Sequence, residues 1–143
     1  MAVSTADAVW EGSLKEGKGT MKTGSGAVNL PYSFRTRFEG APGTNPEELI
    51  GAAHAGCFSM ALSAGLGKSG FTPTRIKTSA KVHLEKVGEG FKITRIQLTT
   101  EAAIPNIDEA KFKEHAEGAK KGCPVSQALA GSQIELDAKL VNA

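Results

Sequence analysis

The chain has little of what would tie it to nucleic acid, to a membrane or to a disulfide framework. Its 143 residues include two cysteines, one tryptophan and one tyrosine. Seventeen lysines and arginines stand against fifteen aspartates and glutamates, which leaves no basic excess to attract nucleic acid or an anionic membrane. No run of about 18 apolar residues is evident, so composition does not suggest a transmembrane helix. We therefore expect no nucleic-acid partner and no membrane.

The scarcity of cysteine also bears on where the protein works. The start of the sequence, MAVSTADAVW, lacks the basic residues and apolar stretch of a secretory signal, so we expect a cytoplasmic protein. Thiols are kept reduced there, and two cysteines are more typical of redox chemistry or metal binding than of a permanent disulfide. The length fits a single domain, residues 1–143, with a core of its own.

The hydrophobic pattern predicts the element order β-β-β-α-β-β-α-α-β. Three strands are expected over residues 6–14, 20–26 and 32–38, and strict alternation in the third places Arg35 and Arg37 on one face. The pattern alone favours two solvated surface charges over a functional pair. This N-terminal region, residues 1–40, has few large apolar residues, so we expect it to pack on a second copy of the chain.

The remainder, residues 45–143, reads as a helix, hairpin, helix and strand core. The best helix runs from Pro46 to about Leu66, with Asn45 as the N-cap and Glu48 three residues after it. A long hairpin is expected over residues 72–87 and 91–104, with a bulge between residues 93 and 96. Two helices, over residues 108–121 and from residue 124, precede a closing strand at residues 132–141.

The two cysteines are the candidate reactive residues. Cys57 lies in the small-residue stretch GAAHAGC of the long helix, where it could be an ordinary buried side chain or an accessible thiol. Cys123 precedes Pro124 at a predicted helix N-cap, where free N–H groups and the helix dipole favour a thiolate. His54, three residues before Cys57, suggests a Cys–His dyad or a metal site. No C-x-x-C pair supports zinc, and no third group is identified that would orient the dyad of a hydrolase.

Two long segments that contain these cysteines resemble a known family. The segments TRFEGAPGTNPEELIGAAHAGCFSMALS (residues 36–63) and KGCPVSQAL (residues 121–129) are similar to the osmotically inducible protein C (OsmC) family. The resemblance extends to VWEGSLKEGKGT and GFTPTRIKT and covers nearly the whole chain. It is closer to the OsmC branch than to the sister organic hydroperoxide resistance (Ohr) branch.

The resemblance implies a fold and an activity. The fold would be a two-layer α/β (α+β) OsmC-like fold, with long central helices packed against antiparallel sheets in an intertwined homodimer. The activity would be a thiol-dependent peroxidase, which reduces organic hydroperoxides at the expense of an external dithiol and needs no cofactor or metal. By position, Cys57 matches the peroxidatic cysteine, Cys123 the resolving cysteine, Arg37 the activating arginine and Glu47 the acid that orients it.

Helix geometry adds an expectation to the resemblance. Glu47 and Cys57 are ten residues apart on one predicted helix, which is about 15 Å along its axis. If both serve one site, we expect Glu47 to come from the other subunit of a two-fold dimer. The rival hypothesis is a redox sensor or a lipid-like-ligand-binding stress protein without turnover. A metal-dependent or hydrolytic enzyme is a more distant alternative.

Overall fold

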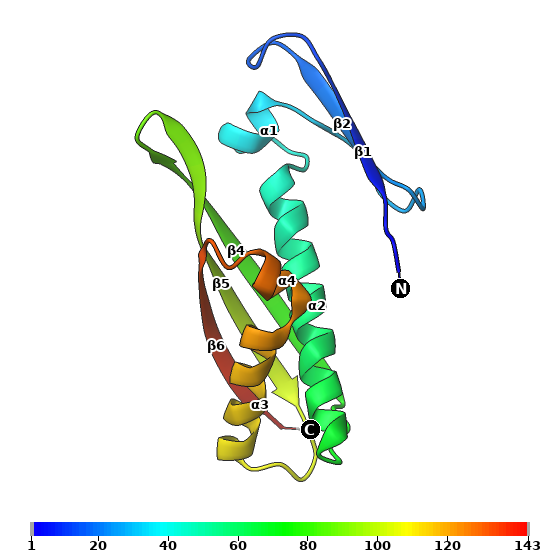
Figure 1. The fold of residues 1–143 in the computed structure, drawn as a ribbon, viewed down its shortest axis with the longest axis vertical. Coiled ribbons are helices and arrows are strands. Elements are labelled where there is room, and N and C mark those ends of the chain that lie inside the picture. The colour runs from blue at the N-terminus through cyan, green and yellow to red at the C-terminus, as the bar shows by residue number, and fades with distance from the viewer. Residues whose placement is uncertain (1, 143) are drawn as a thin grey trace. The chain divides into compact units, whose positions relative to one another are not determined.

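The structure is a computed structural model that describes residues 2–142. The chain divides between Leu49 and Ile50 into two units, which we call the N-terminal unit (residues 2–49) and the C-terminal unit (residues 50–142). Both units combine strands with helices, and Figure 1 labels the elements other than β3.

The N-terminal unit contains a three-stranded antiparallel sheet. Its strands are β1 (Ala6–Glu11), β2 (Lys18–Thr23) and β3 (Asn29–Tyr32), in the spatial order β1-β2-β3. Most side chains of β1 and β3 are exposed, and Val9 and Leu30 are large apolar examples at 56% and 40% exposure. The sheet therefore lacks a covered apolar face of its own, as the few large apolar residues of this region predict.

The expected strand over residues 32–38 is wrong. This segment forms the short helix α1 (Phe34–Phe38), so Arg35 and Arg37 do not lie on one strand face. A capping box explains the difference: Ser33 Oγ accepts from the Thr36 backbone N–H at 3.2 Å, and Thr36 Oγ1 accepts from the Ser33 N–H at 2.9 Å. These reciprocal bonds satisfy two backbone donors and stabilise a helical turn despite the alternating pattern.

The long helix α2 (Pro46–Lys68) starts where the sequence predicts and ends two residues later than expected. Its first turn is capped by Asn45, whose Oδ1 accepts from the Glu48 backbone N–H at 2.8 Å. By length and composition α2 could cross a membrane, although polar residues interrupt its apolar stretch. One such helix is weak evidence, since core helices of water-soluble proteins pass the same test, and part of α2 is buried in the core described below.

A second sheet forms the base of the C-terminal unit. Strands β4 (Arg75–Val87) and β5 (Gly90–Ala103) make the predicted hairpin, and β6 (Gln133–Val141) pairs with β5. Strand β6 pairs with β5 in parallel, whereas we expected antiparallel strands only. The sheet is therefore mixed. A register shift leaves Thr94 as the extra residue between Ile93 and Arg95, which confirms the predicted bulge.

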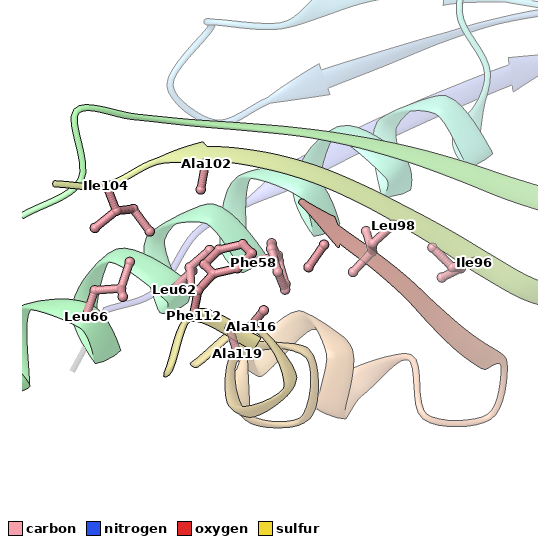
Figure 2. Packing of buried hydrophobic residues seen from close by; sticks show 11 residues of the cluster. Phe58, Leu62, Leu66, Ile96, Leu98, Ala102, Ile104, Phe112, Ala116 and Ala119 are labelled. Atoms are coloured by element: carbon pink, nitrogen blue, oxygen red, sulfur yellow. The ribbon is translucent and has the colours of Figure 1, made fainter. Parts of the chain in front are cut away.

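The core of the C-terminal unit lies between this sheet and its helices (Figure 2). Helix α3 (Glu109–Gly122) and α2 supply side chains that pack on the central strand β5. The fully or nearly fully buried members are Phe58, Leu62, Leu66, Ile96, Leu98, Ala102, Ile104, Phe112, Ala116, Ala119 and Ala138. Gly51 permits a close approach of α2 to β4, because a Cβ there would come within 3.3 Å of Val82 Cγ2.

Cys123 lies at the junction of the last two helices. Helix α3 begins at the N-cap Asp108, as predicted, and it is followed at once by the short α4 (Pro124–Ala128). Cys123 is both the end of α3 and the N-cap of α4. The pair α3–α4 forms the connection between the parallel strands β5 and β6, so the crossover itself carries Cys123.

Candidate functional site

The two cysteines lie side by side in the C-terminal unit. Both are free thiols, and Cys123 is fully buried while Cys57 is partly exposed. Each thiol affects the pKa of the other, and the backbone N–H of Val125 at the start of α4 lowers the pKa of both. Residues separated by 66 positions in the sequence are thus neighbours in the fold.

The surroundings of the two thiols give them different acidities. Burial raises the pKa of Cys57, and the neighbouring Cys123 raises it further, against the lowering effect of the Val125 N–H. Burial also raises the pKa of Cys123, but hydrogen bonds from the Ser126 side chain and backbone, from Cys57 and from Val125 outweigh it, so its pKa is lowered. Cys123 is therefore the better stabilised thiolate within this unit. Cys57 needs a positive charge from elsewhere to ionise at neutral pH.

Two further polar residues extend from Cys123 into the core. The Cys123 thiol donates to Ser126 Oγ at 3.3 Å, and Ser126 Oγ lies 2.7 Å from His54 Nε2. The Ser126 backbone N–H also donates to Cys123 Sγ, at 3.3 Å. His54, Ser126 and Cys123 are all buried, with His54 and Cys123 at 0% exposure. They form a continuous polar row inside an otherwise apolar region.

Arg37 and Glu47 form the second constellation, within the N-terminal unit. Arg37 Nε donates to Glu47 Oε1 and Nη2 donates to Oε2, both at 2.9 Å, so the pair is bidentate. The Glu47 side chain is 9% exposed and that of Arg37 is 34% exposed. The neighbouring Glu48 bonds instead with Thr44 Oγ1. Glu47 thus fixes the guanidinium plane and leaves Arg37 Nη1 outside the pair.

An aromatic pocket adjoins this arginine. It has a volume of about 200 Å³ and its lining includes Trp10, Leu14, Tyr32, Phe34, Arg37 and Phe38. The Arg37 guanidinium carbon lies 5.3 Å from the centre of the Phe38 ring, within the range of a cation–π contact. The pocket therefore joins apolar walls to one cationic group.

The predicted site residues thus fall into two pairs. The structure brings Cys57 to Cys123 in the C-terminal unit and Arg37 to Glu47 in the N-terminal unit. The Cys57–His54 dyad that the sequence suggests does not form through His54 Nε2, because that nitrogen bonds to Ser126. Among residues 2–142 no three His, Cys, Asp or Glu side chains are grouped so that they could hold a metal ion.

Ser126, which bonds to both Cys123 and His54, is a site residue that no motif in the sequence indicates. A spacing signal was present, since His54 lies three residues before Cys57 and Ser126 three residues after Cys123. Residues three apart on helices share a face, so each cysteine carries a polar neighbour on its own face. His54 and Ser126 are 72 positions apart in the sequence. Their contact depends on the packing of α4 against α2, which no local spacing predicts.

Comparisons with known proteins agree with this fold and with these segments. The family model of OsmC-like proteins matches residues 38–139. The chain is 60% identical over 132 residues to Peroxiredoxin OsmC of Escherichia coli (strain K12), with 92% of each chain covered. It is 30% identical over 94 residues to an organic hydroperoxide resistance protein of Xanthomonas axonopodis pv. citri, covering 65% of this chain and 64% of that protein.

Solved structures also match over nearly the full length. The organic hydroperoxide resistance protein OhrB of Bacillus subtilis superposes with a TM-score of 0.72 at 26% identity, covering 96% of this chain and 98% of that one. An OsmC-like protein from Mycoplasma pneumoniae gives a TM-score of 0.75 at 19% identity, covering 98% of both chains, and it supports the fold alone. The expected fold class is confirmed, and the chain belongs to the OsmC-like protein family.

Proposed function

We propose that the chain is a thiol-dependent peroxidase that reduces organic hydroperoxides to alcohols in defence against oxidative stress. The observation that carries this proposal is that the Cys57 and Cys123 thiols, far apart in the sequence, are close enough to affect each other's pKa. The relatives named as a peroxiredoxin and as organic hydroperoxide resistance proteins support the same chemistry. The aromatic pocket at Arg37 suits an apolar substrate better than hydrogen peroxide.

The first step requires Cys57 as a thiolate. Its pKa is raised by burial, so the thiolate needs a cation, and Arg37 held flat by Glu47 is our candidate. Each unit by which the cation lowers the thiol pKa needs about 1.4 kcal/mol of preference for the charged form. A partly desolvated guanidinium can supply this, because its Nη1 is free of the Glu47 pair.

Oxidation and resolution follow from this thiolate. The Cys57 sulfur attacks the terminal oxygen of the hydroperoxide, the O–O bond breaks, and the alkoxide leaves and takes up a proton to become the alcohol. Cys57 is then a sulfenic acid, and attack by Cys123 forms a disulfide and releases water. An external dithiol reduces the disulfide and is itself oxidised. We place this cycle in the cytoplasm, where dithiol reductants keep thiols reduced.

We further propose that two chains share each site in a homodimer. The exposed face of α2 carries Ala52, Ala53, Gly56, Met60 and Ala64, an uncharged surface on which a second copy could pack closely. Met60 is 76% exposed, and nothing lies within 4 Å of a Cβ built at Gly56. Because Arg37 bonds to Glu47 of its own chain, both would reach the partner's Cys57 together.

Mixed dimers test this sharing. A dimer of one Cys57→Ser chain and one Glu47→Ala chain should recover about one of two sites, since intact Cys57 faces an intact Arg37–Glu47 pair once. The matched control places both substitutions in one chain and pairs it with a wild-type chain. Sharing predicts almost no activity for that control. The reverse pattern, an active control and an inactive mixed dimer, would show that each site lies within one chain.

Turnover tests the activity itself. Cumene hydroperoxide should be consumed catalytically with dithiothreitol present, Cys57→Ser should abolish consumption, and Cys123→Ser should leave one oxidation event with impaired recycling. Oxidation of wild-type protein that stops after one equivalent, even with excess dithiol, would refute a peroxidase and favour a redox sensor.

A further inference from the structure

The buried row from Cys123 through Ser126 to His54 has no role in the cycle described so far. It is continuous, with 3.3 Å between Cys123 Sγ and Ser126 Oγ and 2.7 Å between Ser126 Oγ and His54 Nε2. Its members come from three places in the chain: α2, the α3–α4 junction and the first turn of α4. Buried polar side chains are usually hydrogen-bonded, and these three bond to one another through Cys123 Sγ, Ser126 Oγ and His54 Nε2.

The hydrogen bonds of the row have a consistent direction. The Cys123 thiol donates to Ser126 Oγ, which leaves the serine hydroxyl proton free to point at His54 Nε2. If Cys123 loses its proton, every bond can reverse: the imidazole donates to the serine oxygen and the serine hydroxyl donates to the thiolate. The same three atoms therefore fit both protonation states of Cys123 without moving.

The protonation state of His54 suits this reversal. Burial lowers the pKa of His54 below its ordinary 6.5, so the ring is neutral at neutral pH and one nitrogen can accept a proton. Its other nitrogen, Nδ1, is buried and has no hydrogen-bond partner among residues 2–142. Nε2 is therefore the ring atom through which His54 exchanges a proton with the row.

We propose that Ser126 and His54 are a proton relay for Cys123, with Ser126 a catalytic residue and His54 a positioning residue that acts through it. The relay deepens the proposed peroxidase function and rests on it. It would take the Cys123 proton while the disulfide forms and return it while the disulfide is reduced. Cys123, at 0% exposure, has no direct access to solvent for these transfers.

The atoms balance in both directions. In resolution, the Cys123 proton passes to Ser126 Oγ as the serine proton passes to His54 Nε2. The Cys123 sulfur then bonds to the Cys57 sulfur, the S–O bond of the sulfenic acid breaks, and the leaving hydroxide takes a proton from solvent at the partly exposed Cys57 to form water. In reduction, an external dithiol attacks the partly exposed Cys57 sulfur, Cys123 leaves as a thiolate, and His54 returns its proton through Ser126.

The alternative to a relay is a purely structural role, in which the Ser126–His54 hydrogen bond only holds α4 against α2. The two roles separate in the variant His54→Gln, because the glutamine amide can keep a hydrogen bond to Ser126 but cannot carry an additional proton. A purely structural role predicts that His54→Gln is oxidised at Cys57 and resolved by Cys123 at the wild-type rates. A relay predicts slow resolution with an unchanged first oxidation.

The first experiment follows both steps of one turnover by rapid quench and mass spectrometry, with one equivalent of cumene hydroperoxide. His54→Gln and Ser126→Ala should form the Cys57 sulfenic acid at the wild-type rate and convert it to disulfide about 100-fold more slowly. His83→Gln is the matched control, since His83 bonds to Gln97 on the sheet and lies outside the row. Disulfide formation at the wild-type rate in His54→Gln would overturn the relay.

The second experiment needs no peroxide. Protein oxidised with diamide to the Cys57–Cys123 disulfide is reduced with dithiothreitol, and His54→Gln should be reduced at least about tenfold more slowly than wild type. The wild-type rate in mixtures of H₂O and D₂O should show more than one proton in transfer, a readout that requires no variant to fold. A linear, single-proton dependence would refute the relay. Absence of sulfenic acid in the first experiment would instead refute the peroxidase function.

Discussion

The bidentate pair Arg37–Glu47 should contribute far more to stability than its exposed neighbour Arg35–Glu39. Both pairs start from arginines on α1, which makes them a matched comparison. The Arg37 pair is held by two bonds of 2.9 Å, with the Glu47 side chain 9% exposed. The Arg35 pair is a single 3.6 Å contact, with side chains 75% and 55% exposed.

The geometry sets the expected magnitude. Two hydrogen bonds between charged groups contribute roughly 3–6 kcal/mol at most. Arg37 remains about one-third exposed, so water restores part of this when the pair is broken, and we expect a coupling of about 2 kcal/mol. For the exposed pair Arg35–Glu39 we expect about 0.3 kcal/mol.

A double-mutant cycle measures both couplings. Single and double alanine variants of each pair are unfolded in urea at one fixed protein concentration, and the coupling is the non-additive part of the free energy of unfolding. Equal couplings for the two pairs, or a value below about 0.5 kcal/mol for Arg37–Glu47, would refute the reasoning from burial and bidentate geometry. Glu47→Ala should also lose peroxidase activity, because the guanidinium plane is no longer fixed.

Three further predictions concern the C-terminal unit. Phe112→Ala should lower the free energy of unfolding by about 3–5 kcal/mol in urea titrations, because the ring is fully buried; a loss under 1 kcal/mol would contradict this packing. Asp108→Ala should cost about 1 kcal/mol, because its carboxylate accepts the Lys111 backbone N–H at 2.7 Å, and Asp108→Asn should restore most of it. Wild-type stability should fall as pH decreases below 6.5, by up to about 1.4 kcal/mol per pH unit, since unfolded His54 binds a proton that the buried residue does not. His54→Gln should lack this slope, and parallel pH curves for the two proteins would contradict the burial of a neutral ring.

The sequence predicts those elements whose signals are local. Asn45 and Pro46 mark the start of α2, and the structure places the cap bond there. The bulge at Thr94 follows from a break in strand alternation. The alternating pattern of residues 32–38 predicts a strand, but a helix of five residues is too short to display its own period, and the Ser33–Thr36 capping box decides the conformation.

The candidate site depends on long-range placement. The sequence indicates Cys57 and Cys123 as candidates and the family resemblance implies their roles, and the structure adds that the two thiols are neighbours. No local pattern predicts that Ser126 meets His54, or that β6 joins β5 in parallel, because both depend on how the α3–α4 crossover docks. The bidentate geometry of Arg37 likewise depends on α1, a helix in a segment whose pattern predicts a strand.

Because Cys123 lies in the crossover between two parallel strands, the accessibility of its thiol reports whether that crossover is packed in place. Cys57 is synthesised 66 residues before Cys123, and β6 follows Cys123 in the chain. Newly made protein therefore passes through a stage in which an oxidised Cys57 has no neighbour to rescue it. In finished Cys57→Ser protein, the rate at which an alkylating reagent reaches Cys123 measures how often the crossover lifts from the sheet.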